Sequence, residues 1–187
     1  KETQKLLFEN FTKIVDNFSI DAILISDYEK GVVVEDLTMN IINLNHNIPI
    51  FVDPKINNFI KYQNSTLLKP NRNEYNQLCK YYNLTNDLNL ENFKTLAINL
   101  NLKFLVTTLD KDGIILFNKN DNKIRHYPIR NIENKVVDVT GAGDTVLSSL
   151  VYFYLNNKNI EDSVSKANII GSYSVTISGC FVLNKSF

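Results

Sequence analysis

The chain has 187 residues, of which 44% are hydrophobic and 21% charged, as is ordinary for one globular domain with a substantial core. Its formal net charge of +0 at pH 7 argues against the basic surface that binds nucleic acid or an anionic membrane. No apolar run has the length of a membrane span, and the two cysteines, Cys79 and Cys180, lack metal-like spacing and are expected to be buried thiols. These features predict a reduced, cytoplasmic protein with a single domain over residues 1–187.

Apolar runs and helical stripes alternate along the first part of the chain. In chain order they predict a helix over 7–18, a strand over 22–25, a helix over 37–44, strands over 48–52 and 66–68, helices over 75–82 and 90–100, and a strand over 104–107. Strands that alternate with helices are typical of a parallel sheet whose two faces are covered.

The remaining elements complete this layout. Apolar runs at 114–117 and 124–127 lie around a polar turn and predict an antiparallel hairpin, in which His126 is expected at the surface or hydrogen-bonded. A helix over 146–154 follows a glycine-containing loop, and Asn159 is placed to cap a last helix that reaches Ser174. We therefore predict a doubly wound α/β fold with a mostly parallel sheet, helices on both faces and an antiparallel hairpin at its edge.

Polar segments follow the first two predicted strands. The segment 26–31 reads Ser-Asp-Tyr-Glu-Lys-Gly, and Asp53, Pro54 and Lys55 follow the second strand. Open α/β sheets bind ligands at the carboxyl ends of their strands, whereas a solvated loop would have the same residue types. By residue type alone, the solvated loop is the simpler interpretation.

A third strand end carries the sequence Pro-Asn-Arg-Asn-Glu at 70–74. Pro70 would end the strand, and Asn71 would cap the next helix, with Glu74 three residues later in the arrangement of a capping box. Structure alone can therefore explain the pair. A functional role for Glu74 is the alternative.

The segment 138–145 reads Asp-Val-Thr-Gly-Ala-Gly-Asp-Thr and directly precedes a helical stripe. Gly141 and Gly143 allow a tight turn, and the free N–H groups of a helix N-terminus favour an anion such as a phosphate. Asp144 in the first turn then has two interpretations. It complements the helix dipole, or it is a general base that accepts a proton from a hydroxyl during phosphoryl transfer.

This octapeptide resembles the signature of the ribokinase-like carbohydrate kinases of the pfkB type, and neither P-loop spacing nor protein-kinase motifs are present. The resemblance implies that the amides of Gly141, Ala142 and Gly143 form an anion hole and that Asp144 is the catalytic base. It also implies ATP and magnesium (Mg2+) as cofactors and a sugar as the acceptor.

The resemblance extends to the nucleotide side of the site. Asn71 and Glu74 match the Asn-x-x-Glu motif of the family, which lies near the phosphates and organises magnesium partly through water. Thr108 and Gly113 match the ends of a Thr-x-Gly-x-x-Gly turn in which Asp110 replaces the first glycine. Asn168, on the last helix, is expected beside the nucleotide.

Within the family, the segments 26–31 and 53–55 look most like the kinases of D-glycero-β-D-manno-heptose 7-phosphate, which act in ADP-heptose synthesis. That likeness implies Asp27, Lys30, Asp53 and Lys55 on the side of the sugar phosphate. Lys69 departs from this branch, because ribokinases often have lysine before Pro-Asn and heptose kinases tend not to. Another sugar or nucleoside kinase, or a kinase-like chain that binds nucleotide or a partner chain without turnover, remains an alternative.

The motifs match the C-terminal portion of such a kinase. The early strands, the lid and the Gly-Gly sugar signature of the family do not occur in this sequence. We therefore expect that the chain is a fragment of a longer kinase or that its first half lies on a separate chain with which it associates, a homodimer being the other alternative. We expect the 187-residue chain alone to self-associate without appreciable activity.

Overall fold

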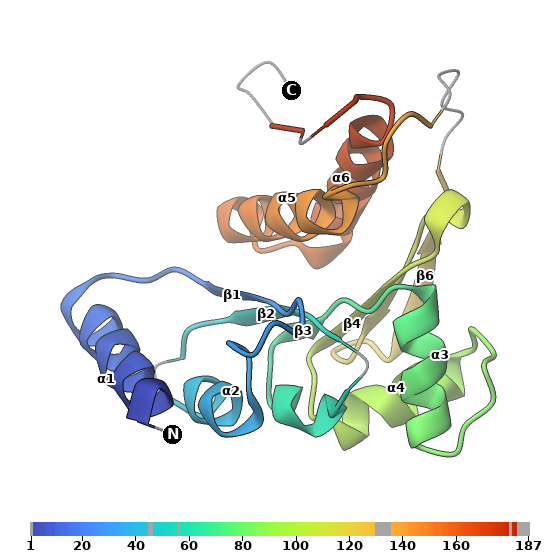
Figure 1. The fold of residues 1–187 in the computed structure, drawn as a ribbon. Helices are drawn as coiled ribbons and strands as arrows, with labels where there is room; N and C mark the ends of the chain where they lie inside the picture. Colours follow the sequence, from blue (N-terminus) through green and yellow to red (C-terminus); the bar gives the residue numbers. More distant parts are fainter. Residues whose placement is uncertain (1, 45–46, 56, 130–135, 180, 183–187) are drawn as a thin grey trace.

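The computed structural model describes residues 2–44, 47–55, 57–129, 136–179 and 181–182, and these contain a six-stranded sheet (Figure 1). The strands lie in chain order across the sheet: β1 (Ile23–Ser26), β2 (Ile50–Asp53), β3 (Leu67–Leu68), β4 (Phe104–Thr108), β5 (Ile114–Asn118) and β6 (Lys123–Tyr127). The first four strands pair in parallel, whereas β5 and β6 add an antiparallel hairpin at one edge.

Helices cover both faces of the sheet (Figure 1). One face carries α2 (Glu35–Ile42), the 3-10 helix η1 (Phe59–Tyr62), α3 (Arg72–Tyr81) and α4 (Leu90–Asn99), with α1 (Glu2–Asn17) beside α2. The other face carries α5 (Ala142–Asn157) and α6 (Ile160–Ser174), which pack extensively against each other. A second 3-10 helix, η2 (Asp110–Asp112), follows β4.

The strands are apolar because both of their faces are buried. Successive side chains of a strand point to opposite faces, so Phe51 packs in the core under α5 and α6 while Val52 packs in the core over α3 and α4. Leu67 and Leu68 divide between the two cores in the same way, and all four side chains are 0% exposed. The continuous apolar runs of the sequence thus have the burial that a covered parallel sheet requires.

The predicted fold is confirmed: the sheet is mostly parallel, helices lie on both faces, and an antiparallel hairpin forms the edge. The predicted caps are also present, since the Asn159 side chain accepts hydrogen bonds from the amides of Glu161 and Asp162. Cys79 is a buried thiol as predicted, and Cys180 lies outside the described residues. Among the described residues, no helix is both long and apolar enough to cross a membrane.

Candidate active site

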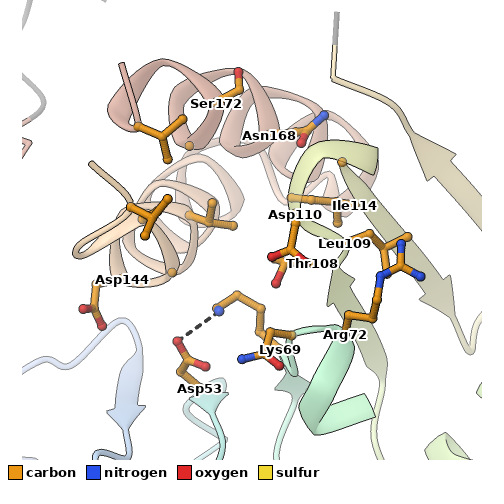
Figure 2. Close-up of a pocket in the computed structure, with 18 of the residues that line it drawn as sticks. Asp53, Lys69, Arg72, Thr108, Leu109, Asp110, Ile114, Asp144, Asn168 and Ser172 are labelled. Atoms are coloured by element: carbon orange, nitrogen blue, oxygen red, sulfur yellow. Dashed lines mark ion pairs between the residues drawn. The ribbon is translucent and has the colours of Figure 1, made fainter. Parts of the chain in front are cut away.

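A cleft of about 960 Å³ lies at the carboxyl ends of the parallel strands, beside the N-terminus of α5 (Figure 2). Twelve of the thirteen predicted site residues line it: Asp27, Asp53, Lys55, Asn71, Glu74, Thr108, Gly113, Gly141, Ala142, Gly143, Asp144 and Asn168. Lys30 is exposed and is not among the lining residues. The sheet thus brings together motifs that are up to 141 residues apart in the chain.

The N-terminus of α5 forms one wall of the cleft. Gly141 caps the helix in a left-handed conformation with φ 74°, which glycine adopts without strain, and its carbonyl accepts the first helical hydrogen bond from the Thr145 amide at 2.9 Å. A Cβ atom added to Gly143 would lie 3.4 Å from Asp53 Oδ2 and 3.5 Å from Lys69 Nζ. The helix terminus therefore stands directly over a buried ammonium group, and the two together suit an anion.

Asp144 lies in the first turn of α5 and contacts two hydroxyl groups from the end of β1. Ser26 Oγ donates to Asp144 Oδ1 at 3.0 Å, and the Tyr28 hydroxyl donates to Oδ2. The hydrogen bond to Asp144 raises the pKa of Tyr28 above its ordinary value, so the phenol stays protonated at neutral pH. Sequence reasoning selected the segment 26–31 but did not identify Ser26 and Tyr28 as partners of Asp144.

The floor of the cleft holds an ion pair between Lys69 Nζ and Asp53 Oδ2, 2.9 Å apart (Figure 2). The Lys69 side chain is 2% exposed and that of Asp53 is 18% exposed. Burial raises the pKa of Asp53 by more than the neighbouring ammonium of Lys69 lowers it. Sequence reasoning treated Lys69 only as a departure from a motif; its signal was a lysine directly after a buried apolar strand.

Glu74 has the capping role that its position predicted, and it also binds Lys55. Its Oε2 accepts from the Asn71 amide, and its own amide donates to Asn71 Oδ1, each at 2.9 Å, which completes the capping box of α3. Its Oε1 accepts from Lys55 Nζ at 3.0 Å. Burial lowers the pKa of Lys55, but the Glu74 carboxylate outweighs this and the net shift is upward.

These contacts bear on where magnesium would fit. Each carboxylate oxygen of Glu74 already accepts one N–H donor, which leaves lone pairs for metal-bound water but makes direct ligation compete with Lys55. Among the described residues, no group of three or more His, Cys, Asp or Glu side chains is placed to hold a metal. The residues present therefore fit a magnesium ion that is held mainly by phosphate oxygens and contacted by Glu74 through water.

Asp27 is a buried carboxylate with several partners. Its Oδ2 accepts from Lys61 Nζ and from the Tyr62 hydroxyl, each at 2.6 Å, and its Oδ1 accepts from the Glu29 amide at 2.7 Å. Burial alone would raise the pKa of Asp27, but these donors together hold it below its ordinary value. Asp27 thus anchors the loop after β1 to η1, and its predicted contact with a sugar stays a prediction.

The turn after β4 is the short 3-10 helix η2, in which Asp110 stands at the position of the expected glycine. Asp110 adopts a left-handed conformation with φ 51°, which aspartate tolerates better than most residues. Gly113, with φ 89°, admits no side chain, since a Cβ atom there would lie 2.1 Å from the Tyr127 carbonyl oxygen. The Arg72 guanidinium and the Asp112 carboxylate, 2.6 Å apart, join this turn to α3.

Asn168 connects α6 to the edge hairpin, because its side-chain amide donates to the Tyr127 carbonyl at 2.9 Å. Three residues later, a Cβ atom on Gly171 would lie 2.3 Å from Val146 Cγ2, so this glycine allows α6 to pack closely on α5. His126, in the hairpin, lies with Nε2 2.6 Å from the Asp112 carbonyl oxygen, as expected for a hydrogen-bonded histidine. The nucleotide contact predicted for Asn168 stays a prediction.

Comparisons with known proteins agree with these motifs. The model of the pfkB family of carbohydrate kinases matches residues 3–185. The bifunctional protein HldE of Campylobacter curvus is 38% identical over 181 residues, which cover 95% of this chain and 37% of the relative. HldE of Nitratiruptor sp. is 34% identical over 168 residues, or 89% of this chain and 34% of the relative. The chain spans about a third of the length of these curated relatives.

Solved structures show the same fold. Ribokinase from Thermotoga maritima superposes with a TM-score of 0.72 at 23% identity and covers 85% of this chain, which in turn covers 51% of that structure. At this identity the likeness concerns the fold. The described sheet and its helices therefore match about half of that kinase.

Proposed function

Because the chain belongs to the pfkB family of carbohydrate kinases, we propose that it transfers the γ-phosphoryl group of ATP to a sugar hydroxyl, with D-glycero-β-D-manno-heptose 7-phosphate as the acceptor. The observation that carries the proposal is the position of Asp144. Its carboxylate lies in the first turn of α5, in the cleft, next to the glycine-lined helix terminus and above the buried Lys69 ammonium.

This arrangement suits an in-line transfer. Asp144 accepts the proton of the attacking hydroxyl, whose oxygen forms a bond to the γ-phosphorus as the bond to the bridging oxygen of ADP breaks. The N–H groups at the start of α5 and the Lys69 ammonium stabilise the negative charge on the phosphoryl oxygens. Kinases of this family use ATP and Mg2+, and bound magnesium would neutralise charge on the phosphates, with Glu74 and Asn71 organising its water ligands.

The choice of acceptor rests on sequence. The segments 26–31 and 53–55 resemble the heptose-7-phosphate kinases, and the HldE relatives are 38% and 34% identical to the chain. Lys69 favours a second candidate, another sugar kinase of the same family, because its buried ammonium occupies a position where the heptose kinases tend to have an uncharged residue.

A panel of acceptors tests the proposal. The full-length gene product is incubated with ATP and Mg2+ and with heptose 7-phosphate, ribose, fructose 6-phosphate or adenosine, and ADP formation is followed with each. We expect heptose 7-phosphate to give the highest kcat/KM by at least tenfold. Preference for another sugar would contradict heptose 7-phosphate as the acceptor, but the chain would still be assigned as a sugar kinase. Nucleotide binding without transfer to any acceptor would identify a kinase-like binding protein instead.

A further inference from the structure

The two oxygens of the Asp144 carboxylate hold two hydroxyl groups that differ in how firmly they are placed. Ser26 Oγ contacts Oδ1, and the Tyr28 hydroxyl contacts Oδ2. Both side chains leave the end of β1 on the side of α5, whereas Asp27 between them points to the opposite side, toward Lys61 and Tyr62. The motif Ser-Asp-Tyr thus places two hydroxyl donors on Asp144, while the Asp27 carboxylate between them binds Lys61 on the other side of the strand.

Ser26 is held by the sheet. It is the last residue of β1 and pairs in register with Asp53 of β2, and the next amide, of Asp27, donates to the Asp53 carbonyl at 3.0 Å. Asp27 is in turn fixed by the buried Lys61 ammonium. The backbone of Ser26 is therefore fixed by the sheet, and its hydroxyl, although exposed, starts from a fixed point from which it can orient the Asp144 carboxylate.

Tyr28 is held much less firmly. It lies beyond the strand, is 58% exposed, and lines the cleft. A hydrogen bond at an exposed site can exchange for another at little cost, so the phenol can swing away when a ligand enters. While it stays, it occupies one lone-pair position of Oδ2, one of the two oxygens that an attacking hydroxyl can use.

The Tyr28 phenol cannot replace the base. Its pKa is raised by the hydrogen bond to Asp144, so at neutral pH it remains a proton donor and does not accept the proton of an acceptor hydroxyl. An exposed proton donor on the carboxylate, in the cleft, favours a group that competes with the acceptor hydroxyl for Asp144 rather than one that serves as a base.

We propose that Tyr28 is a specificity-determining residue that occupies the place of the acceptor hydroxyl on Asp144 until a sugar displaces it, and so suppresses transfer to water. The inference rests on the proposed kinase function. A sugar displaces the phenol because the rest of the molecule binds in the cleft, whereas a water molecule has no such additional contacts. In both reactions the attacking oxygen bonds to the γ-phosphorus, ADP leaves with the electron pair of the broken bond, and the proton passes to Asp144.

Removal of the Tyr28 hydroxyl tests the inference. In the full-length gene product, Tyr28→Phe is expected to raise ATP hydrolysis without sugar about tenfold, the effect of one hydrogen bond to a charged group. The KM for the sugar is expected to fall, because the sugar no longer competes with the phenol. Tyr152→Phe is the matched control: Tyr152 is 59% exposed, lies on α5 and does not line the cleft.

Two results with an active wild-type protein would overturn the inference. One is unchanged hydrolysis in Tyr28→Phe. The other is a tenfold or larger fall in kcat with no rise in hydrolysis, which would make Tyr28 a residue that positions the base.

A titration separates this inference from the proposed function. With tyrosines labelled with carbon-13, NMR follows the ionisation of Tyr28, whose pKa is expected to lie above 10.0 in the wild type and to fall toward 10.0 in Asp144→Asn. An identical pKa in the two proteins would overturn the contact and the inference with it. A raised pKa in a wild type that neither transfers nor hydrolyses would instead overturn the proposed function, leaving a contact without a catalytic role.

Discussion

Two sides of the cleft use acidic residues in different ways. On the side of β1 and α5, the Asp144 carboxylate is bound by hydroxyl groups, one of them on the exposed Tyr28. On the floor, the Asp53 carboxylate is bound by an ammonium group that is 2% exposed. Neutral, exposed partners can be exchanged for a substrate, whereas breaking a buried ion pair leaves an uncompensated charge. The hydroxyl partners of Asp144 therefore suit exchange for a substrate, whereas the Lys69–Asp53 ion pair suits a fixed electrostatic environment on the floor of the cleft.

The largest effect is expected at Asp144. Asp144→Asn keeps the shape of the side chain but removes the proposed base, so kcat should fall by about a hundred- to ten-thousandfold while the Kd for ATP stays within about threefold. Steady-state kinetics and calorimetric titration measure the two quantities. Asp36→Asn is the control, since Asp36 is an exposed carboxylate in the first turn of α2. Equal, small effects of both substitutions would leave Asp144 as a residue that only complements a helix dipole.

Loss of the ion pair on the floor of the cleft should lower the free energy of unfolding, by an amount that depends on pH. Lys69→Met leaves Asp53 buried without its ammonium, so the free energy of unfolding should fall by about 3 kcal/mol at pH 8. Burial already raises the pKa of Asp53, and loss of Lys69 raises it further, so the folded state binds a proton more readily than the unfolded state does. Stability is thus lost as the pH rises through the folded pKa, and the deficit should shrink at pH 5.

Urea unfolding at the two pH values measures this deficit. The double variant Asp53→Asn with Lys69→Met removes the buried charge and should recover part of the loss at pH 8. A deficit that is equal at both pH values would show that packing of the lysine stem, rather than charge, stabilises the floor.

Glu74 has a structural role in capping α3 and a proposed role in organising magnesium, and two substitutions separate them. Glu74→Ala removes the side-chain half of the capping box of α3, the hydrogen bond from the Asn71 amide, and the partner of Lys55, and should lower the free energy of unfolding by about 1–2 kcal/mol. Glu74→Gln keeps an oxygen that accepts from the Asn71 amide, so it should retain most of that stability while raising the Mg2+ concentration needed for half-maximal activity severalfold. An unchanged magnesium requirement in Glu74→Gln would reduce Glu74 to a capping residue.

The smallest effect is expected for the exposed ion pair of Arg72 and Asp112, whose side chains are 39% and 52% exposed. Arg72→Gln should change the free energy of unfolding by less than about 1 kcal/mol, and the change should diminish further in 1 M salt. Thermal unfolding at low and high salt measures it. A larger loss of stability that salt does not reduce would show that exposure alone does not distinguish the ion pair of Asp112 from that of Asp53.

Much of the fold follows from local patterns. Runs such as 48–52 predict buried parallel strands because only a strand covered on both faces is apolar at successive positions, and Phe51 and Val52 are indeed 0% exposed on opposite faces. Caps are equally local, since the Asn71 and Glu74 partners lie three residues apart. The turn at Asp110 was harder to predict, because an aspartate takes the left-handed conformation only where its surroundings support it.

The sequence by itself determined the elements, the helix terminus at Gly141 and the presence of a carboxylate beside it, because each depends on residues within one turn or one strand. Tertiary structure decided which groups meet. Ser26 and Tyr28 reach Asp144 across 118 and 116 residues, Lys69 lies buried against Asp53, and Asp27 turns away toward Lys61. These contacts depend on which strand ends are neighbours in the sheet and on the face to which each side chain points, and neither follows from spacing along the chain.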